Sequence, residues 1–307
     1  MNRQRIGFIG LGNMGGRMTR RLAGVGHPVL GFDPVPGRAA LAGATPAASV
    51  AEVAGRSDCI LLSLPDSTVI ESVVLGDGGL LDAGRPGQVI ADLSTAAPSS
   101  TQRLYATLAA RVVDYLDAGI SGGAAGAEHG TLTLMVGGQA AALDAIGWVF
   151  EPIASKVVHM GDSGAGHLTK ILNNLLNAVS LAATAEVMLA AKKAGLDLGR
   201  VLEVLNASTG VNFATLNRFP HIIKGNYLEG GLTSGLMTKD IVLYVDCLGG
   251  LGVPCLAASG PLAAFGLANS LGYRDQISNR VVDALGDVAG GVRLHDDGSG
   301  PTGGTDG

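Results

Sequence analysis

The stretch between Gly164 and Gly195 constrains the fold of this chain more than any other part of the sequence. After Gly166 it contains no glycine or proline until Gly195, and its apolar residues recur at helical spacing. The pattern predicts one helix of about 28 residues, roughly 40 Å long at 1.5 Å per residue. Further apolar side chains lie outside the main stripe, so we expect this helix to be buried on most sides and to act as a spine.

One narrow face of the predicted helix is polar. Its members recur at i, i+3, i+4 and i+7, and they are Lys170, Asn173, Asn174 and Asn177. Burying an ammonium group without a partner is costly, so this face is expected to border a wet cleft or a ligand. The other interpretation is that Lys170 reaches solvent while the amides bind loop backbone. The helix alone leaves both interpretations open.

A glycine-rich loop lies near the start of the chain. It follows a short apolar run at residues 5–10, precedes a helical pattern, and carries Gly10, Gly12 and Gly15 as G-x-G-x-x-G. A dinucleotide-binding turn needs glycine at these places for the tight turn, for approach of a pyrophosphate, and for packing of the helix on the strand. The pattern therefore predicts a dinucleotide site.

The next predicted strand, residues 28–33, ends at Asp33. An acidic residue there can accept a hydrogen bond from a ribose 2′-hydroxyl and repels a 2′-phosphate, which favours NAD. Arg38 lies nearby and could bind a 2′-phosphate, so NADP is not excluded.

Short apolar runs alternate with helical patterns as far as residue 162. This alternation predicts a parallel, doubly wound, Rossmann-type sheet. Ligands of such sheets bind beyond the carboxyl ends of the strands, where four segments are expected to meet. They are the Gly10 loop, Leu64-Pro65, Ser94-Thr95 and Ser121-Gly122-Gly123.

Residues 121–123 open a stretch rich in glycine. Successive backbone N–H groups in such a turn form an anion nest that suits a carboxylate substrate. The alternative is a glycine-rich connection that only permits a tight bend.

From the spine helix onward the pattern is helical, with no convincing strand. We therefore predict a cofactor domain at 1–162, an all-helical substrate and oligomerisation domain at 163–290, and a disordered tail at 291–307, where apolar residues are sparse.

Composition excludes several classes of function. A net charge of −5 with scattered basic residues argues against a nucleic-acid partner. The three cysteines form no CxxC pair and the histidines are dispersed, so neither a disulfide framework nor a metal site is expected. The N-terminus lacks a signal-peptide pattern, and the lysine and asparagines of the spine helix argue against a membrane span. We expect a cytoplasmic protein with a small-molecule substrate and no membrane partner.

Five motifs in order resemble those of the β-hydroxyacid dehydrogenase family, in the 3-hydroxyisobutyrate dehydrogenase group. They are FIGLGNMG (8–15), DLST (92–95), DAGISGGAAGAEHGTLTLMVGG (117–138), GAGHLTKILNN (164–174) and LMTKD (236–240). The resemblance implies an N-terminal Rossmann domain joined by the long helix to a helical domain that forms a homodimer or homotetramer.

The resemblance also implies roles for individual residues. Lys170 matches the catalytic lysine and Asn174 the amide beside it, and Ser121, Gly122 and Gly123 match the loop that binds the substrate carboxylate. The positions that match cofactor contacts are Gly10, Leu11, Gly12, Asn13, Met14, Gly15, Asp33, Leu64, Pro65, Thr95 and Lys239.

The implied activity is reversible hydride transfer between NAD or NADP and a small β-hydroxy carboxylic acid. Candidate substrates are 3-hydroxyisobutyrate, glycerate or tartronate semialdehyde, and 4-hydroxybutyrate. The alternatives are an imine reductase on the same scaffold, against which Lys170 counts, and a catalytically silent NAD-binding module.

Two departures from the family pattern concern the substrate. The usual Pro and Val of DAPVSGG are Gly119 and Ile120 here, which we expect to loosen the substrate loop. Residues 211–213 (VNF) replace a segment that is often polar and then Trp in relatives. This second change puts 3-hydroxyisobutyrate itself in question.

Overall fold

The computed structural model describes residues 4–295, which divide into two compact units. The first ends at Leu172 and the second begins at Asn173, so the first two turns of the long helix belong to the first unit. This division lies ten residues beyond the predicted boundary at 162, because a buried side chain of the sheet, Asp117, binds the start of the helix.

The first unit is built around an eight-stranded sheet of order β3-β2-β1-β4-β5-β6-β7-β8. The strands are β1 (Ile6–Ile9), β2 (Val29–Phe32), β3 (Thr45–Pro46), β4 (Cys59–Leu62), β5 (Val89–Asp92), β6 (Asp114–Ser121), β7 (Leu132–Gly137) and β8 (Ala154–Gly161). The helices are α1 (Asn13–Gly24), α2 (Arg38–Leu41), α3 (Val50–Arg56), α4 (Ser67–Leu75), α5 (Leu80–Ala83), α6 (Pro98–Ala109), α7 (Gly123–His129) and α8 (Ala140–Phe150).

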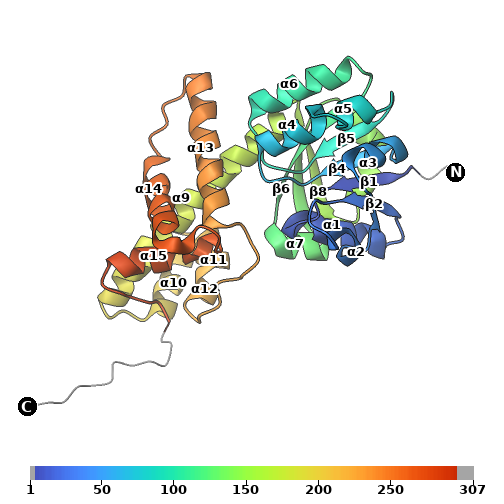
Figure 1. Ribbon diagram of the computed structural model, residues 1–307. Coiled ribbons are helices and arrows are strands. Elements are labelled where there is room, and N and C mark those ends of the chain that lie inside the picture. The colour runs from blue at the N-terminus through green and yellow to red at the C-terminus, as the bar shows by residue number, and fades with distance from the viewer. Residues whose placement is uncertain (1–3, 296–307) are drawn as a thin grey trace, which may run out of the picture. The chain divides into compact units, whose positions relative to one another are not determined.

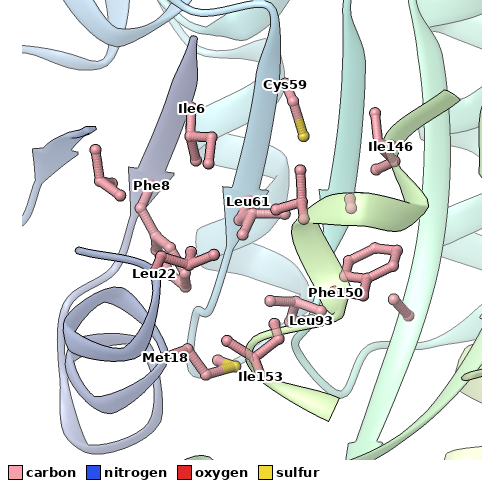
Figure 2. Close-up of a cluster of buried hydrophobic side chains, with 14 of the residues drawn as sticks. Ile6, Phe8, Met18, Leu22, Cys59, Leu61, Leu93, Ile146, Phe150 and Ile153 are labelled. Carbon is pink, nitrogen blue, oxygen red and sulfur yellow. The ribbon is translucent and has the colours of Figure 1, made fainter. Parts of the chain in front are cut away.

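Successive strand residues face opposite sides of this sheet and form two cores. On one side Phe8 and Leu61 pack with Leu22 of α1 and Phe150 of α8 (Figure 2). The other side buries further strand residues against α3, α4 and α6. Figure 1 shows α1 and α7 on one face of the sheet and α4 and α6 on the other. Fully burying one such apolar side chain contributes about 1.5–3 kcal/mol. Helices cover both faces of the sheet, and this confirms the predicted doubly wound arrangement.

The sheet departs from the prediction at one pair of strands. β6 and β7 run antiparallel, with Gly119 opposite Met135, while all other neighbouring strands are parallel. A parallel return needs a crossover of about a dozen residues. Only the short α7 and a left-handed turn at Gly130 separate these strands, so the chain returns in the opposite direction. The predicted parallel sheet therefore contains one antiparallel pair.

The second unit is helical in its described part, residues 173–295. Its elements, with α9 shared between the units, are α9 (Ala165–Lys193), α10 (Leu198–Asn206), α11 (Phe213–Asn217), α12 (Phe219–Ile222), α13 (Ser234–Leu251), α14 (Ser259–Ala268), the π-helix η1 (Asn269–Tyr273), the 3₁₀-helix η2 (Ser278–Arg280) and α15 (Val281–Val288). The predicted spine is therefore a single uninterrupted helix.

The burial of α9 is less complete than predicted. Leu176 is 71% exposed and Val187 is 46% exposed in the single chain. Residues 165–193 are long and apolar enough to cross a membrane by length and composition, but 56% of the most apolar window is buried inside the protein, as in the core helix of a globular domain.

The structure describes the first five residues of the predicted disordered tail, residues 291–295. Leu294 is 3% exposed and belongs to the core of the second unit, and Arg293 forms an ion pair with Asp287. Leu294 is therefore packed and Arg293 is paired, although apolar residues are sparse in this segment. The rest of the predicted disordered tail, residues 296–307, lies outside the described residues.

Candidate active site

The three glycines of the N-terminal loop have three different surroundings. A Cβ atom at Gly10, where φ is +88°, would collide with the carbonyl oxygen of Ser63, and one at Gly15 would collide with that of Gly10. Gly12 is open, because its nearest neighbour would be an Arg38 nitrogen at 3.9 Å. Gly10 thus makes the turn, Gly15 permits packing of α1 on the strand, and Gly12 leaves room for a pyrophosphate.

Asp33 lies at the end of β2 beside this loop, as predicted. Its Oδ2 accepts a hydrogen bond of 2.8 Å from the N–H of Leu11, and its Oδ1 accepts one of 2.9 Å from Val35. Arg38 approaches the same carboxylate at 3.3 Å, and the Asp33 side chain is only 4% exposed. The structure therefore places the candidate ribose acceptor and the candidate 2′-phosphate ligand side by side.

Two more loops at this edge of the sheet are joined by a hydrogen bond. The N–H of Leu64, after β4, donates to Ser94 Oγ after β5 at 2.9 Å. Pro65 follows in an exposed position, and Asp66 caps α4 by accepting from the N–H of Val69 at 3.0 Å. The loops that carry the predicted cofactor residues Leu64, Pro65 and Thr95 are thus held together.

The start of α9 is fixed to the sheet by a buried carboxylate that the sequence analysis missed. Asp117, in β6, is 0% exposed. Its Oδ1 accepts from the N–H of Gly164 and its Oδ2 from the N–H of His167, both at 2.8 Å. A carboxylate is favourable at the positive end of a helix, and these bonds satisfy N–H groups that would otherwise be orphaned. Lys170 follows one turn later.

His167 is a second buried group that the sequence analysis missed. Its Nε2 lies 3.2 Å from the carbonyl oxygen of Asp92, which can only accept, so Nε2 carries the proton and donates. Its Nδ1 lies 2.8 Å from the hydroxyl oxygen of Thr101. The contact ties α9 to β5 and to α6.

Asp92 extends this network to the loop after β5. Its Oδ1 accepts from the N–H of Ser94 at 3.0 Å, and its Oδ2 accepts from the hydroxyl of Tyr115 at 2.7 Å. Burial is the main cause that raises the pKa of Tyr115 well above its ordinary value, so Tyr115 remains a neutral donor. Hydrogen bonds therefore run without interruption from the predicted cofactor loop after β5 to the first turn of α9.

The predicted carboxylate loop joins β6 to α7. Ser121 ends β6, and Gly122 and Gly123 follow with φ angles of +126° and +62°. Residues other than glycine rarely adopt these angles, so the turn requires both glycines. Gly122 and Gly123 are exposed, which leaves their backbone groups accessible.

In the second unit, Asn174 is oriented by Asp240. Asn174 is 3% exposed, and its Nδ2 donates to Asp240 Oδ2 at 2.5 Å. Lys239 Nζ lies 3.1 Å from the other oxygen of the same carboxylate. The structure thus brings together three residues of the predicted motifs.

Asn177, further along the polar face, binds another side chain. Its Oδ1 accepts from Arg218 at 2.9 Å, and burial lowers the pKa of Arg218 to about 10. Asn174 and Asn177 therefore bind side chains rather than loop backbone, which argues against the second interpretation of the polar face.

One signal in the sequence could have revealed the missed carboxylates. Asp92 and Asp117 stand at or near the ends of apolar runs, and a buried carboxylate requires partners. Apart from the N–H of Ser94, their partners lie 23 to 75 residues away, so the sequence pattern could not identify those partners. Among residues 4–295, no group of three or more His, Cys, Asp or Glu side chains could hold a metal ion.

The sequence matches two family models that cover most of the chain. Residues 5–161 match the NAD binding domain of 6-phosphogluconate dehydrogenase, and residues 164–284 match a model described as NAD-binding of NADP-dependent 3-hydroxyisobutyrate dehydrogenase.

Individual proteins are similar over nearly their whole length. The chain is 37% identical to the 2-(hydroxymethyl)glutarate dehydrogenase of Eubacterium barkeri, over 88% of this chain and 92% of that protein. It is 35% identical to the NAD-dependent L-serine dehydrogenase of Pseudomonas aeruginosa, over 86% and 90% respectively. A solved structure of Mycobacterium tuberculosis 3-hydroxyisobutyrate dehydrogenase with L-serine superposes with a TM-score of 0.82 at 31% identity, covering 92% of this chain and 99% of that one.

Proposed function

The chain belongs to the β-hydroxyacid dehydrogenase family of NAD(P)-dependent oxidoreductases, and we propose that it oxidises the β-hydroxyl of a small carboxylic acid reversibly. One observation carries the proposal. Asp117 and His167 hold the first turn of α9, and through it Lys170, to the same strand ends that carry the predicted cofactor loops. A proton-transfer group is thereby fixed on the element next to the dinucleotide site.

The residues of the first unit fit a nicotinamide dinucleotide. Open space at Gly12 and the start of α1 suit the pyrophosphate, and Asp33 suits the ribose 2′-hydroxyl. The cofactor, when bound, supplies hydride acceptance and donation, and the protein supplies binding, orientation and proton transfer. Because Asp33 repels a 2′-phosphate, NAD is the favoured cofactor, with Arg38 as the feature that would admit NADP.

We assign proton transfer to Lys170. During oxidation it takes the proton of the substrate hydroxyl, and during reduction it returns a proton to the carbonyl oxygen. Asn174 lies one helical turn further along α9, so its amide can orient the same oxygen. The Asp240 carboxylate fixes the rotamer of that amide.

The backbone of Ser121, Gly122 and Gly123 is assigned to the substrate carboxylate. Backbone N–H groups of such a turn can surround an anion without carrying a net charge. Binding of the carboxylate there would fix the orientation of the substrate relative to Lys170.

The substrates named for the similar proteins define a chemical class. 2-(Hydroxymethyl)glutarate, L-serine and 3-hydroxyisobutyrate are all 3-hydroxypropanoates that differ only in the group on carbon 2. We propose a 2-substituted 3-hydroxypropanoate for this chain. Glycerate belongs to that class, whereas 4-hydroxybutyrate does not.

We further propose that a second copy of the chain covers part of α9. Leu176, Ala183 and Val187 lie on one face of the helix and are exposed. Exposed apolar side chains that recur along one face of a long helix are typical of an interface. This supports a homodimer or a larger homo-oligomer.

Replacing Lys170 with Ala tests the assigned chemistry. Loss of a general acid–base group is expected to lower kcat by about 10²- to 10⁴-fold. Binding of NAD, measured by quenching of protein fluorescence, should be retained because the cofactor loops are untouched. Undiminished turnover by the Lys170→Ala variant would refute the assignment.

A further inference from the structure

Gly119 lies in the middle of β6, and the space beside it is filled by the catalytic lysine. A Cβ atom at position 119 would lie 2.5 Å from Lys170 Cβ and 3.1 Å from Lys170 Cγ. Real Cβ atoms essentially never come within 3.0 Å of another heavy atom. In this chain the stem of Lys170 therefore occupies the space that the ring of the family's usual proline would need at position 119.

The backbone around this contact is equally close. A Cβ at Gly166, in the first turn of α9, would collide with the carbonyl oxygens of Asp117 and Met135. One at Gly137 would lie 2.8 Å from the Gly166 nitrogen. The start of α9 therefore rests directly on the backbone of β6 and β7, and Gly119 is the member of this group that meets the lysine side chain.

Lys170 has little freedom to move away. Asp117 and His167 fix the preceding turn of α9 through buried hydrogen bonds, so a new methyl group at position 119 must turn the lysine stem or displace the helix. The sequence suggested that glycine here loosens the substrate loop. The contact adds that glycine at this position allows the lysine stem to lie close to β6.

We propose that Gly119 is a positioning residue, which sets how closely the side chain of Lys170 approaches β6 and hence the reacting carbon. This proposal rests on the proposed function, in which Lys170 transfers the proton. A misplacement of about 1 Å can lower turnover about 10²-fold even when binding is retained.

The test compares two glycine-to-alanine variants of the full-length chain in which the shortest contact of the new methyl group is the same. In Gly119→Ala the new methyl group meets Lys170, whereas in Gly7→Ala it meets Val53 Cγ1, also at 2.5 Å, within the core of the same unit. Gly147→Ala, with nothing within 4 Å, controls for the substitution itself. For each variant kcat, KM, the NAD dissociation constant and Tm are measured.

Gly119→Ala is expected to lower kcat by about tenfold to a hundredfold while NAD binding changes by less than about twofold. Gly7→Ala is expected to lower Tm and keep kcat. Equal kcat in both variants, with Tm lowered in both, would mean that Gly119 only permits packing and would overturn the proposal.

A double variant covers the case in which Gly119→Ala does not fold. Lys170→Gly removes the stem that the methyl group meets, so Lys170→Gly/Gly119→Ala should have the same Tm as Lys170→Gly. If the double variant remains unfolded, the crowding is against the Gly166 carbonyl oxygen, 3.1 Å away, and the proposal fails. Turnover by Lys170→Ala would instead refute the proposed function, which separates the two failures.

Discussion

Asp33 illustrates how one carboxylate can organise a cofactor loop before any cofactor is bound. It accepts from the N–H of Leu11 and is itself approached by Arg38, so the loop and both candidate ribose contacts are held by a single side chain. Each of its two oxygens already accepts one backbone N–H, Oδ2 from Leu11 and Oδ1 from Val35, and keeps further acceptor capacity for a ribose hydroxyl. A ligand therefore has to share this carboxylate with the loop.

Replacing Asp33 with Asn tests this role. The amide keeps the shape but loses the charge, and a hydrogen bond to a charged group contributes about 1.5–3 kcal/mol. We expect KM for NAD to rise at least about tenfold and the preference for NAD over NADP to shrink. The ratio of kcat/KM for the two cofactors measures this. Arg38→Ala should change the ratio in the opposite direction, and an unchanged ratio in Asp33→Asn would show that Asp33 does not select the cofactor.

At the scale of elements, the sequence predicted those structural features that depend on residues close together in the chain. The G-x-G-x-x-G turn and α9 were predictable because glycine conformation and helical periodicity act within a few residues. The antiparallel β6/β7 pair and the hydrogen bonds of Asp117 and His167 were not, because they join residues distant in the sequence. The candidate lysine could thus be identified from the sequence, but what holds it in place could not.

The starts of β1 and β4 are joined by a charged cluster. Asp58 accepts from the backbone N–H of Arg5 at 2.9 Å and from the Arg5 guanidinium at 2.9 Å, and Arg85 lies 3.2 Å away. The Arg5 side-chain hydrogen bond is the main cause that holds the pKa of Asp58 well below its ordinary value of 3.8.

This cluster predicts a loss of stability in acid. A carboxyl whose pKa is lowered by folding contributes stability above its unfolded pKa of about 4, and the contribution disappears as the pH falls below that value. Tm measured from neutral pH down to strongly acidic pH should therefore fall less steeply in Asp58→Asn than in the wild type. Asp77→Asn, at an exposed site, is the control. Parallel curves for Asp58→Asn and the wild type would rule out this contribution.

At the scale of the whole molecule, the exposed apolar face of α9 predicts self-association. Leu176→Glu places a charge on that face, so we expect the oligomer to dissociate in sedimentation experiments while the chain remains folded. Leu41→Glu is a matched control, because Leu41 is 76% exposed and lies on the short helix α2. A monomeric wild-type chain, or an oligomer that survives Leu176→Glu, would contradict the proposed interface.

The most direct test of the central claim is turnover with a panel of hydroxy acids, followed by the absorbance of reduced nicotinamide. The panel contains 3-hydroxypropanoates that carry methyl, amino, hydroxyl or carboxyethyl groups on carbon 2, with 4-hydroxybutyrate for comparison, each tested with NAD and with NADP. We predict turnover of at least one 2-substituted 3-hydroxypropanoate, faster with NAD, which disappears in Lys170→Ala. Absence of turnover across the panel with NAD binding intact would contradict this account and favour a catalytically silent dinucleotide-binding module. Reduction of a cyclic imine instead would contradict it and favour an imine reductase.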